Sequence, residues 1–150
     1  MHSINLERNW CSIQKKEHLK DEIIVTSYNI LAECNIQPFL FKGRDLSQLA
    51  IKKRYPLIIK ELEELKSDII FLQEVDMDFH ISLISDLENW AKKNKKALIY
   101  RKKPYKSKPE GCVIIYDTTK FELKDWHFCN LTLHENINYF RVDNTSDLGI

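Results

Sequence analysis

The fold is decided by Ile69-Ile70-Phe71-Leu72-Gln73-Glu74, in which four apolar residues run directly into two polar ones. An earlier stretch, Ile23-Ile24-Val25-Thr26-Ser27-Tyr28-Asn29, also begins apolar and ends polar. Short apolar runs of this kind are typical of parallel strands that are buried in the middle of a sheet. Open α/β sheets bind their ligands beyond the carboxyl ends of such strands. The sequence therefore predicts that Asn29 and Glu74 lie together at one edge of a sheet.

Helices are expected on both sides of the second strand. Before it, apolar residues recur at helical spacing at Ile51, Tyr55, Ile58, Leu62 and Leu65. Because proline is tolerated in a first turn but not in a helix interior, we expect a regular helix from Pro56 to Lys66, with a kinked or separate turn before it. After the strand, a second helix is expected, which Asp76 or Asp78 could cap and whose apolar face comprises Leu83, Ile84, Leu87, Trp90 and Ala91.

The second half of the chain is predicted to consist mainly of strands. They are expected at Ala97–Tyr100, Gly111–Tyr116, Phe121–Leu123, Trp126–Leu131 and Ile137–Val142. Strands that alternate with helices and are then followed by further strands indicate an α/β fold, with helices packed on a mixed sheet. Within it, Gly111 is expected to permit a close backbone approach, and Cys112 to fill the core.

Length and composition indicate one globular domain. The chain has 150 residues, of which 43% are hydrophobic and 30% charged. The 23 basic and 22 acidic residues nearly cancel, so net charge indicates no particular partner. Without an apolar run of membrane-spanning length or a signal peptide, we expect no membrane contact and an intracellular location, cytoplasmic rather than nuclear. Residues 1–21 form a charged lead-in to a domain over 22–150. The scattered cysteines, Cys11, Cys34, Cys112 and Cys129, are expected to be free and buried.

The residue types at the two strand ends suit the binding of a hard cation and a phosphate group. A carboxylate such as Glu74 is a preferred ligand of Mg²⁺, and an amide such as Asn29 both donates and accepts hydrogen bonds. Each residue also has a purely structural interpretation. Asn29 could close the turn after its strand, and Glu74 could cap the next helix or pair with a lysine. For Asp76, a helix cap is favoured over a supporting role in the site.

A basic segment follows the predicted strand at Ala97–Tyr100. It contains Arg101, Lys102, Lys103, Lys106 and Lys108, interrupted by Tyr105. The cations could follow a nucleic-acid backbone while the tyrosine ring stacks on a base. The alternative, a solvated charged loop with no partner, is equally compatible with the sequence.

Four blocks of the sequence together resemble one protein family. They are Ser27–Leu31, Arg54 with Ile58–Leu62, Asp68–Ile70 leading into Leu72–Val75, and Lys108–Ile114. In this order they are similar to the endonuclease/exonuclease/phosphatase superfamily, in the branch of the carbon catabolite repressor-type deadenylases, nocturnin and the Angel proteins. Three stretches look most like the Angel proteins: Arg8-Asn9-Trp10, Arg54-Tyr55-Pro56 and Lys108-Pro109-Glu110-Gly111-Cys112.

The resemblance implies a deoxyribonuclease-like α/β sandwich, of which this chain would hold the first sheet and its helices. Members of the family continue beyond the position that matches Ile150 into a second sheet, which brings a further catalytic aspartate and histidine. We therefore expect an incomplete domain that hydrolyses little or nothing alone. Its uncovered sheet face is expected to associate with itself or with a protein partner.

The resemblance also implies a function. The residue that matches Glu74 binds Mg²⁺, and the one that matches Asn29 helps to orient the phosphate. The favoured hypothesis is a Mg²⁺-dependent phosphodiesterase or exoribonuclease acting on RNA 3′ ends, such as a poly(A) deadenylase. One alternative is an RNA 2′,3′-cyclic phosphatase of the Angel type. Another is a catalytically dead module that binds RNA or a protein.

Overall fold

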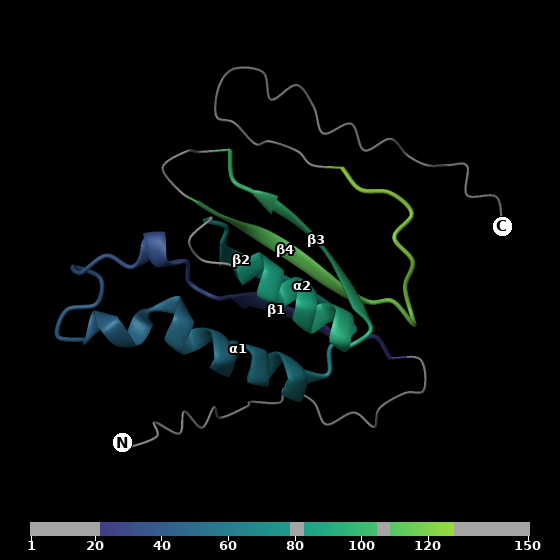
Figure 1. Ribbon diagram of the computed structural model, residues 1–150, viewed down its shortest axis with the longest axis horizontal. Coiled ribbons are helices and arrows are strands. Elements are labelled where there is room, and N and C mark those ends of the chain that lie inside the picture. The colour runs from purple at the N-terminus through teal and green to yellow at the C-terminus, as the bar shows by residue number, and fades with distance from the viewer. Residues whose placement is uncertain (1–21, 79–82, 105–108, 128–150) are drawn as a thin grey trace.

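A four-stranded mixed sheet forms the centre of the molecule in the computed structural model, which describes residues 22–78, 83–104 and 109–127 (Figure 1). Its strands are β1 (Val25–Asn29), β2 (Ile69–Asp76), β3 (Lys96–Lys102) and β4 (Glu110–Asp117), arranged in the order β1-β2-β4-β3. β1 and β2 are parallel neighbours, whereas β4 runs antiparallel to both β2 and β3. The predicted mixed α/β sheet is therefore confirmed.

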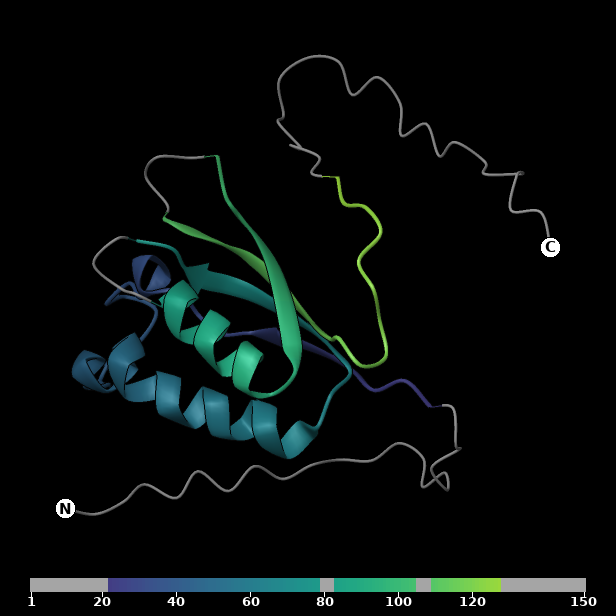
Figure 2. The ribbon, with the colours of Figure 1, turned by 45° about the vertical axis from the view of Figure 1, so that its right-hand side comes forward.

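Two helices cover one face of this sheet (Figure 2). They are α1 (Ile51–Leu65) and α2 (Leu83–Lys93). Their apolar residues pack on the sheet in a core that includes Ile58, Leu62, Ile70, Leu72, Leu87, Trp90, Val113 and Ile115. Within the described residues, neither helix combines the length and the apolar character that a membrane crossing requires. The predicted apolar face of α2 is confirmed.

The start of α1 differs from the prediction. The helix is continuous from Ile51, and Pro56 lies inside it. A proline here removes the hydrogen bond to the carbonyl of Lys52. Burial of Ile51 and Ile58 on either side of the proline offsets that loss, because both side chains belong to the core. The predicted break before Pro56 is therefore wrong, and a short 3₁₀ helix, η2 (Leu46–Leu49), lies upstream of α1.

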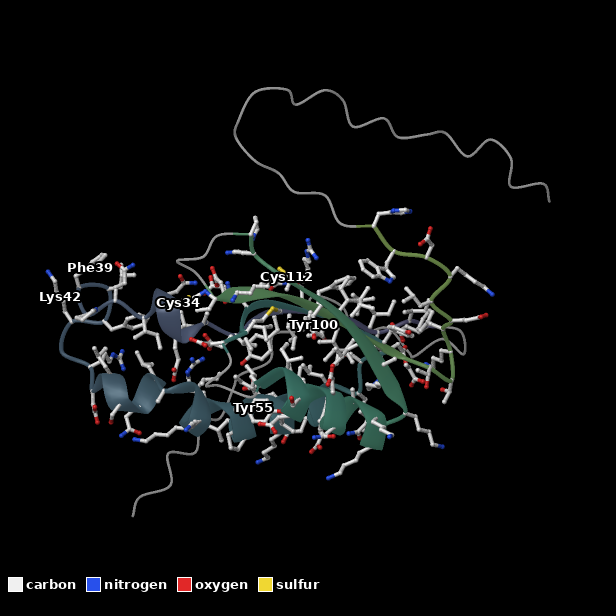
Figure 3. All side chains as sticks on the ribbon, turned by 45° about the horizontal axis from the view of Figure 1, so that its top comes forward. Cys34, Phe39, Lys42, Tyr55, Tyr100 and Cys112 are labelled. Atoms are coloured by element: carbon white, nitrogen blue, oxygen red, sulfur yellow. The ribbon has the colours of Figure 1, made fainter. Side chains whose placement is uncertain are left out.

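Two further expectations were wrong. Residues 121–127 form neither helix nor strand, so the strand predicted at Phe121–Leu123 is absent. Cys112 does not fill the core. It is exposed on the side of the sheet opposite the helices (Figure 3), because strand alternation turns its neighbour Val113 inward instead.

Other predictions are confirmed or lie beyond the described residues. Cys34 and Cys112 are both free thiols, and Cys34 is partly buried. Cys11, Cys129, the lead-in over 1–21 and the strand predicted at Ile137–Val142 lie outside the described residues. So does most of the strand predicted at Trp126–Leu131.

Candidate functional site

A β-bulge in β2 presents the Glu74 carboxylate. Leu72 pairs with Val113 and Val75 with Gly111, so Gln73 and Glu74 together face a single residue of β4. Glu74 has a φ of 54°, in the left-handed region that non-glycine residues seldom adopt. Leu72 and Val75 consequently point into the same core, and the extra residue of the bulge changes the direction of the Glu74 side chain between them. The sequence predicted Glu74 at the end of its strand, whereas β2 continues to Asp76.

Asn29 and Glu74 lie together, as predicted. The Asn29 Nδ2 atom donates to Glu74 Oε1 at 2.8 Å, and Asn29 Oδ1 accepts from the Leu31 backbone N–H at 2.9 Å. Asn29 therefore closes the turn after β1, as its structural interpretation predicts, and also holds the Glu74 carboxylate. Its contact with a phosphate stays a prediction. Glu74 does not cap a helix, since α2 begins at Leu83.

A second amide holds the other oxygen of Glu74. η1 (Glu33–Asn35), a short 3₁₀ helix after β1, places Asn35 so that its Nδ2 donates at 2.8 Å to Glu74 Oε2 and, also at 2.8 Å, to Glu110 Oε2. Glu110 is fully buried, and its other oxygen, Oε1, lies 2.6 Å from Lys103 Nζ. We call Asn29, Asn35, Glu74, Lys103 and Glu110 the Glu74 cluster.

Hydrogen bonds to the Glu74 carboxylate favour its ionised form. Burial acts to raise the pKa of this carboxyl, but hydrogen bonds from Asn29, Asn35 and the Ala32 backbone outweigh it and bring the pKa below its usual range. Glu74 is therefore ionised at neutral pH. The pKa of Lys103 is raised, chiefly by its hydrogen bond to Glu110, so this lysine is charged.

Asp76 is a buried residue that supports the site through the segment after β1. It does not cap α2. Its two carboxylate oxygens accept from the Glu33 backbone N–H at 3.0 and 3.1 Å, which fixes the start of η1. Burial raises the pKa of Asp76 to about 6, although the Glu33 N–H and the nearby Arg54 oppose the rise. The cap predicted for Asp76 was wrong because β2 extends through this residue.

Arg54 secures the same turn from α1. Its guanidinium donates to the backbone carbonyls of Ile30, Leu31 and Leu49. The Glu33 side chain adds another tie, because its Oε1 accepts from the Ile51 N–H at 2.7 Å. These contacts connect the segment after Asn29 to the start of α1, and they keep η1 against the end of the sheet.

The donor set around Glu74 fits a magnesium ion that keeps most of its water. Mg²⁺ is usually bound by one or two carboxylates together with waters and substrate phosphate oxygens. Glu74 supplies one ionised carboxylate beside a neutral amide. Among the residues that the structure describes, no group of three or more His, Cys, Asp or Glu side chains could hold a metal ion. A cage made entirely of protein ligands is therefore absent from this part of the chain.

The basic segment is only partly described. Arg101 is exposed at the end of β3, whereas Lys103 is engaged with Glu110. Tyr105, Lys106 and Lys108 lie outside the described residues. The nucleic-acid contact predicted for this segment stays a prediction.

Comparison with known proteins places this arrangement in a family. No family model matches the chain. Protein angel of Drosophila melanogaster is 33% identical over 125 residues, which is 79% of this chain and 35% of that protein. Protein angel homolog 2 of Danio rerio is 34% identical over 109 residues, or 69% of this chain and 18% of that protein. This chain is a partial homologue of the Angel proteins. The similarity predicted from the sequence blocks is thereby confirmed, within the endonuclease/exonuclease/phosphatase superfamily.

Solved Angel structures agree with this relationship. The crystal structure of ANGEL2, a 2′,3′-cyclic phosphatase, matches with a TM-score of 0.61 and 27% identity. Its complex with adenosine-2′,3′-vanadate matches with a TM-score of 0.59, covering 69% of this chain and 29% of ANGEL2. The Angel homologue thus spans about a third or less of the relatives that it matches.

Sequence reasoning missed two members of the Glu74 cluster in this Angel homologue. Asn35 lies in an irregular segment with no periodic pattern, so nothing local marks it. Glu110 had a local signal, because it stands directly before a glycine at the start of a predicted strand. Its partners at positions 35 and 103 become evident only from the packing of β3 and β4 beside η1.

Proposed function

We propose that this chain contributes the Glu74 side of a Mg²⁺-dependent site that hydrolyses 2′,3′-cyclic phosphate ends of RNA. The observation that supports the proposal is the ionised Glu74 carboxylate, held by two amides in a homologue of a 2′,3′-cyclic phosphatase. In adenosine-2′,3′-vanadate, vanadium takes the place of phosphorus in a ring closed by the two ribose oxygens. ANGEL2 binds that molecule. The poly(A) deadenylase hypothesis has less support, because the Angel protein of known structure is a 2′,3′-cyclic phosphatase.

Glu74 and Asn29 would have separate roles in the reaction. Glu74 would hold Mg²⁺, which when bound neutralises charge on the phosphate and polarises it toward attack by water. Asn29 Nδ2 has a second hydrogen besides the one given to Glu74, and it can donate to a phosphate oxygen. Asn29 Oδ1 is held by the Leu31 N–H, so the amide is already oriented before a substrate arrives.

The proposal is tested by ligand binding to the 150-residue chain. Isothermal titration with adenosine 2′,3′-cyclic phosphate, with and without Mg²⁺, is expected to show binding that requires the metal. Glu74→Gln keeps the size of the side chain but loses its charge and one of its two acceptor oxygens, so it should abolish most of the Mg²⁺-dependent binding. Glu88→Gln makes the same chemical change on the exposed side of α2 and serves as the matched control.

Two outcomes would contradict the proposal. Binding that is unchanged by Glu74→Gln would remove the metal role from this residue. Tighter Mg²⁺-dependent binding of a short oligoadenylate with a free 3′ hydroxyl would favour the deadenylase hypothesis instead.

A further inference from the structure

Asn35 is the bridge between the candidate metal ligand and the ion pair that buried Glu110 makes with the partly exposed Lys103. Its Nδ2 carries two hydrogens and donates one to Glu74 and one to Glu110, each at 2.8 Å. Both acceptors are carboxylates, so only the nitrogen end of the amide can occupy this position. A neutral double donor between two acids also reduces the repulsion between them. The orientation of the Asn35 amide is therefore fixed by its contacts.

Glu110 and Lys103 make the far end of this bridge rigid. The Glu110 side chain is fully buried, and its two oxygens are satisfied by Lys103 at 2.6 Å and by Asn35. Lys103 and Glu110 are also joined through their backbones, because the Lys103 N–H donates to the Glu110 carbonyl at 2.9 Å. A buried carboxylate with all its partners in place has little freedom to rotate. Glu110 therefore offers Asn35 an acceptor whose position is held by its own contacts.

The backbone around Asn35 is also held. The Asn35 N–H donates to the Ala32 carbonyl at 3.0 Å, and Asn35 is the last residue of the short helix η1. Asp76 binds the first residue of that helix, Glu33. Asn35 and Glu110 thus belong to well-connected parts of the fold, whereas the Glu74 side chain extends from a bulge and gains its direction from the amides that bind it.

Resting on the proposed function, we infer that Asn35 is a positioning residue that aims the Glu74 carboxylate at Mg²⁺, and that the Glu110–Lys103 pair acts through Asn35. Groups that orient a metal ligand from behind commonly change metal affinity by 10- to 100-fold when they are removed. Asn35 would touch neither the metal nor the substrate. A role limited to stabilising η1 would leave both the Mg²⁺ affinity and the titration of Glu74 unchanged.

The test uses the 150-residue chain and two readouts, Mg²⁺ affinity by calorimetry and the Glu74 side-chain pKa by carboxyl NMR. Asn35→Ala is expected to weaken Mg²⁺ binding by about tenfold and to raise the pKa of Glu74, because one stabilising donor is lost. Asn94→Ala is the matched control. Asn94 Nδ2 also donates one hydrogen bond, to the Trp90 carbonyl, at the opposite end of the sheet. Neither readout should change in that variant.

Glu110→Gln tests whether the Glu110–Lys103 pair acts through Asn35. Its effect on Mg²⁺ affinity should disappear when Asn35→Ala is already present, as in a double-mutant cycle. If Asn35→Ala does not fold, Asn35→Ser keeps a polar side chain that is too short to reach both carboxylates, and the same two changes are expected.

The failures of the two proposals are distinguishable. Wild-type Mg²⁺ affinity and an unchanged Glu74 pKa in Asn35→Ala would overturn the positioning role alone, provided that Glu74→Gln still loses the metal. Equal Mg²⁺ binding by the wild type and Glu74→Gln would overturn the proposed metal site. In that case a raised Glu74 pKa in Asn35→Ala would still establish the bridge.

Discussion

At the scale of single residues, the site combines two carboxylates with opposite electrostatic behaviour. Glu74 receives several hydrogen bonds and is kept ionised, whereas Asp76 is almost fully buried and its pKa rises to about 6. The difference follows from their surroundings. Two side-chain amides compensate the burial of Glu74, but burial outweighs the Glu33 N–H and Arg54 at Asp76. One residue is therefore suited to a cation and the other to holding a backbone turn.

The raised pKa of Asp76 predicts a pH dependence of stability. Between its ordinary pKa of 3.8 and about 6, folded Asp76 keeps a proton that the unfolded chain has released. The contribution of Asp76 is thus fully present at low pH, and the free energy of unfolding should fall as the pH rises through this window. Urea denaturation at several pH values should show this slope, and Asp76→Asn should flatten it.

The control for this slope is Asp86→Asn, on the exposed side of α2. It makes the same chemical change away from the site and should leave the slope in place. If the free energy of unfolding of Asp76→Asn still depended on pH as in the wild type, the proton would be held by another group.

At the scale of elements, the junction of β2, β3 and β4 determines where Glu110 lies. Gly111 stands at this junction, and a Cβ atom added to it would lie 2.1 Å from the Arg101 carbonyl oxygen and 2.6 Å from Met77 Sδ. The predicted close backbone approach is confirmed. The backbone oxygen belongs to a paired strand and cannot move without shifting β3.

We therefore predict that Gly111→Ala lowers the free energy of unfolding by about 1–3 kcal/mol, the usual cost of overpacking. Gly43→Ala is an informative comparison. Gly43 has a φ of 73° but no atom within 4 Å of an added Cβ, so it should lose only the smaller cost of backbone strain. Urea denaturation of both variants measures the difference. A cost for Gly111→Ala no greater than that for Gly43→Ala would contradict the steric argument.

Elements with a strong internal pattern could be predicted from the sequence, and features that depend on pairing could not. The apolar spacing of α2 and the runs that become β1 and β2 were sufficient to locate these elements and to bring Asn29 near Glu74. The bulge at Gln73 and Glu74 could not be foreseen, because it is defined by the register between β2 and β4. Asn35 was missed for the same reason, since its importance lies in contacts with residues 39 and 75 positions away.

At the scale of the whole molecule, the sheet separates the end that carries the Glu74 cluster from an end where contacts of Asp68 stabilise the fold. The Glu74 cluster lies toward the carboxyl end of β2, whereas Asp68 stands just before its first residue. There Asp68 Oδ2 accepts from the Ile24 N–H at 2.9 Å, and Oδ1 lies 2.7 Å from Lys120 Nζ. The Asp68 backbone carbonyl also accepts from the Asp117 N–H at 2.9 Å. Asp68 thereby joins the segment before β1, the start of β2 and the end of β4.

This separation predicts that stability can be lowered without loss of metal affinity. Lys120→Gln should reduce the free energy of unfolding by about 1–3 kcal/mol, because it leaves the largely buried Asp68 carboxylate without its cation. Lys124→Gln breaks an ion pair that is exposed on both sides and should cost less than about 1 kcal/mol.

The Asp68–Lys120 pair should also contribute to the response to acid. The hydrogen bond from Lys120 leads the causes that lower the pKa of Asp68, so this stabilisation is present above its ordinary pKa of 3.8 and is lost as the pH falls. Lys120→Gln should therefore weaken the loss of stability in acid, while the slope assigned to Asp76 at higher pH and the Mg²⁺ affinity of the folded protein stay at wild-type values. Because the two ends share β2, a parallel loss of Mg²⁺ affinity would mean that strain at Asp68 reaches the bulge and that the ends of the sheet are coupled.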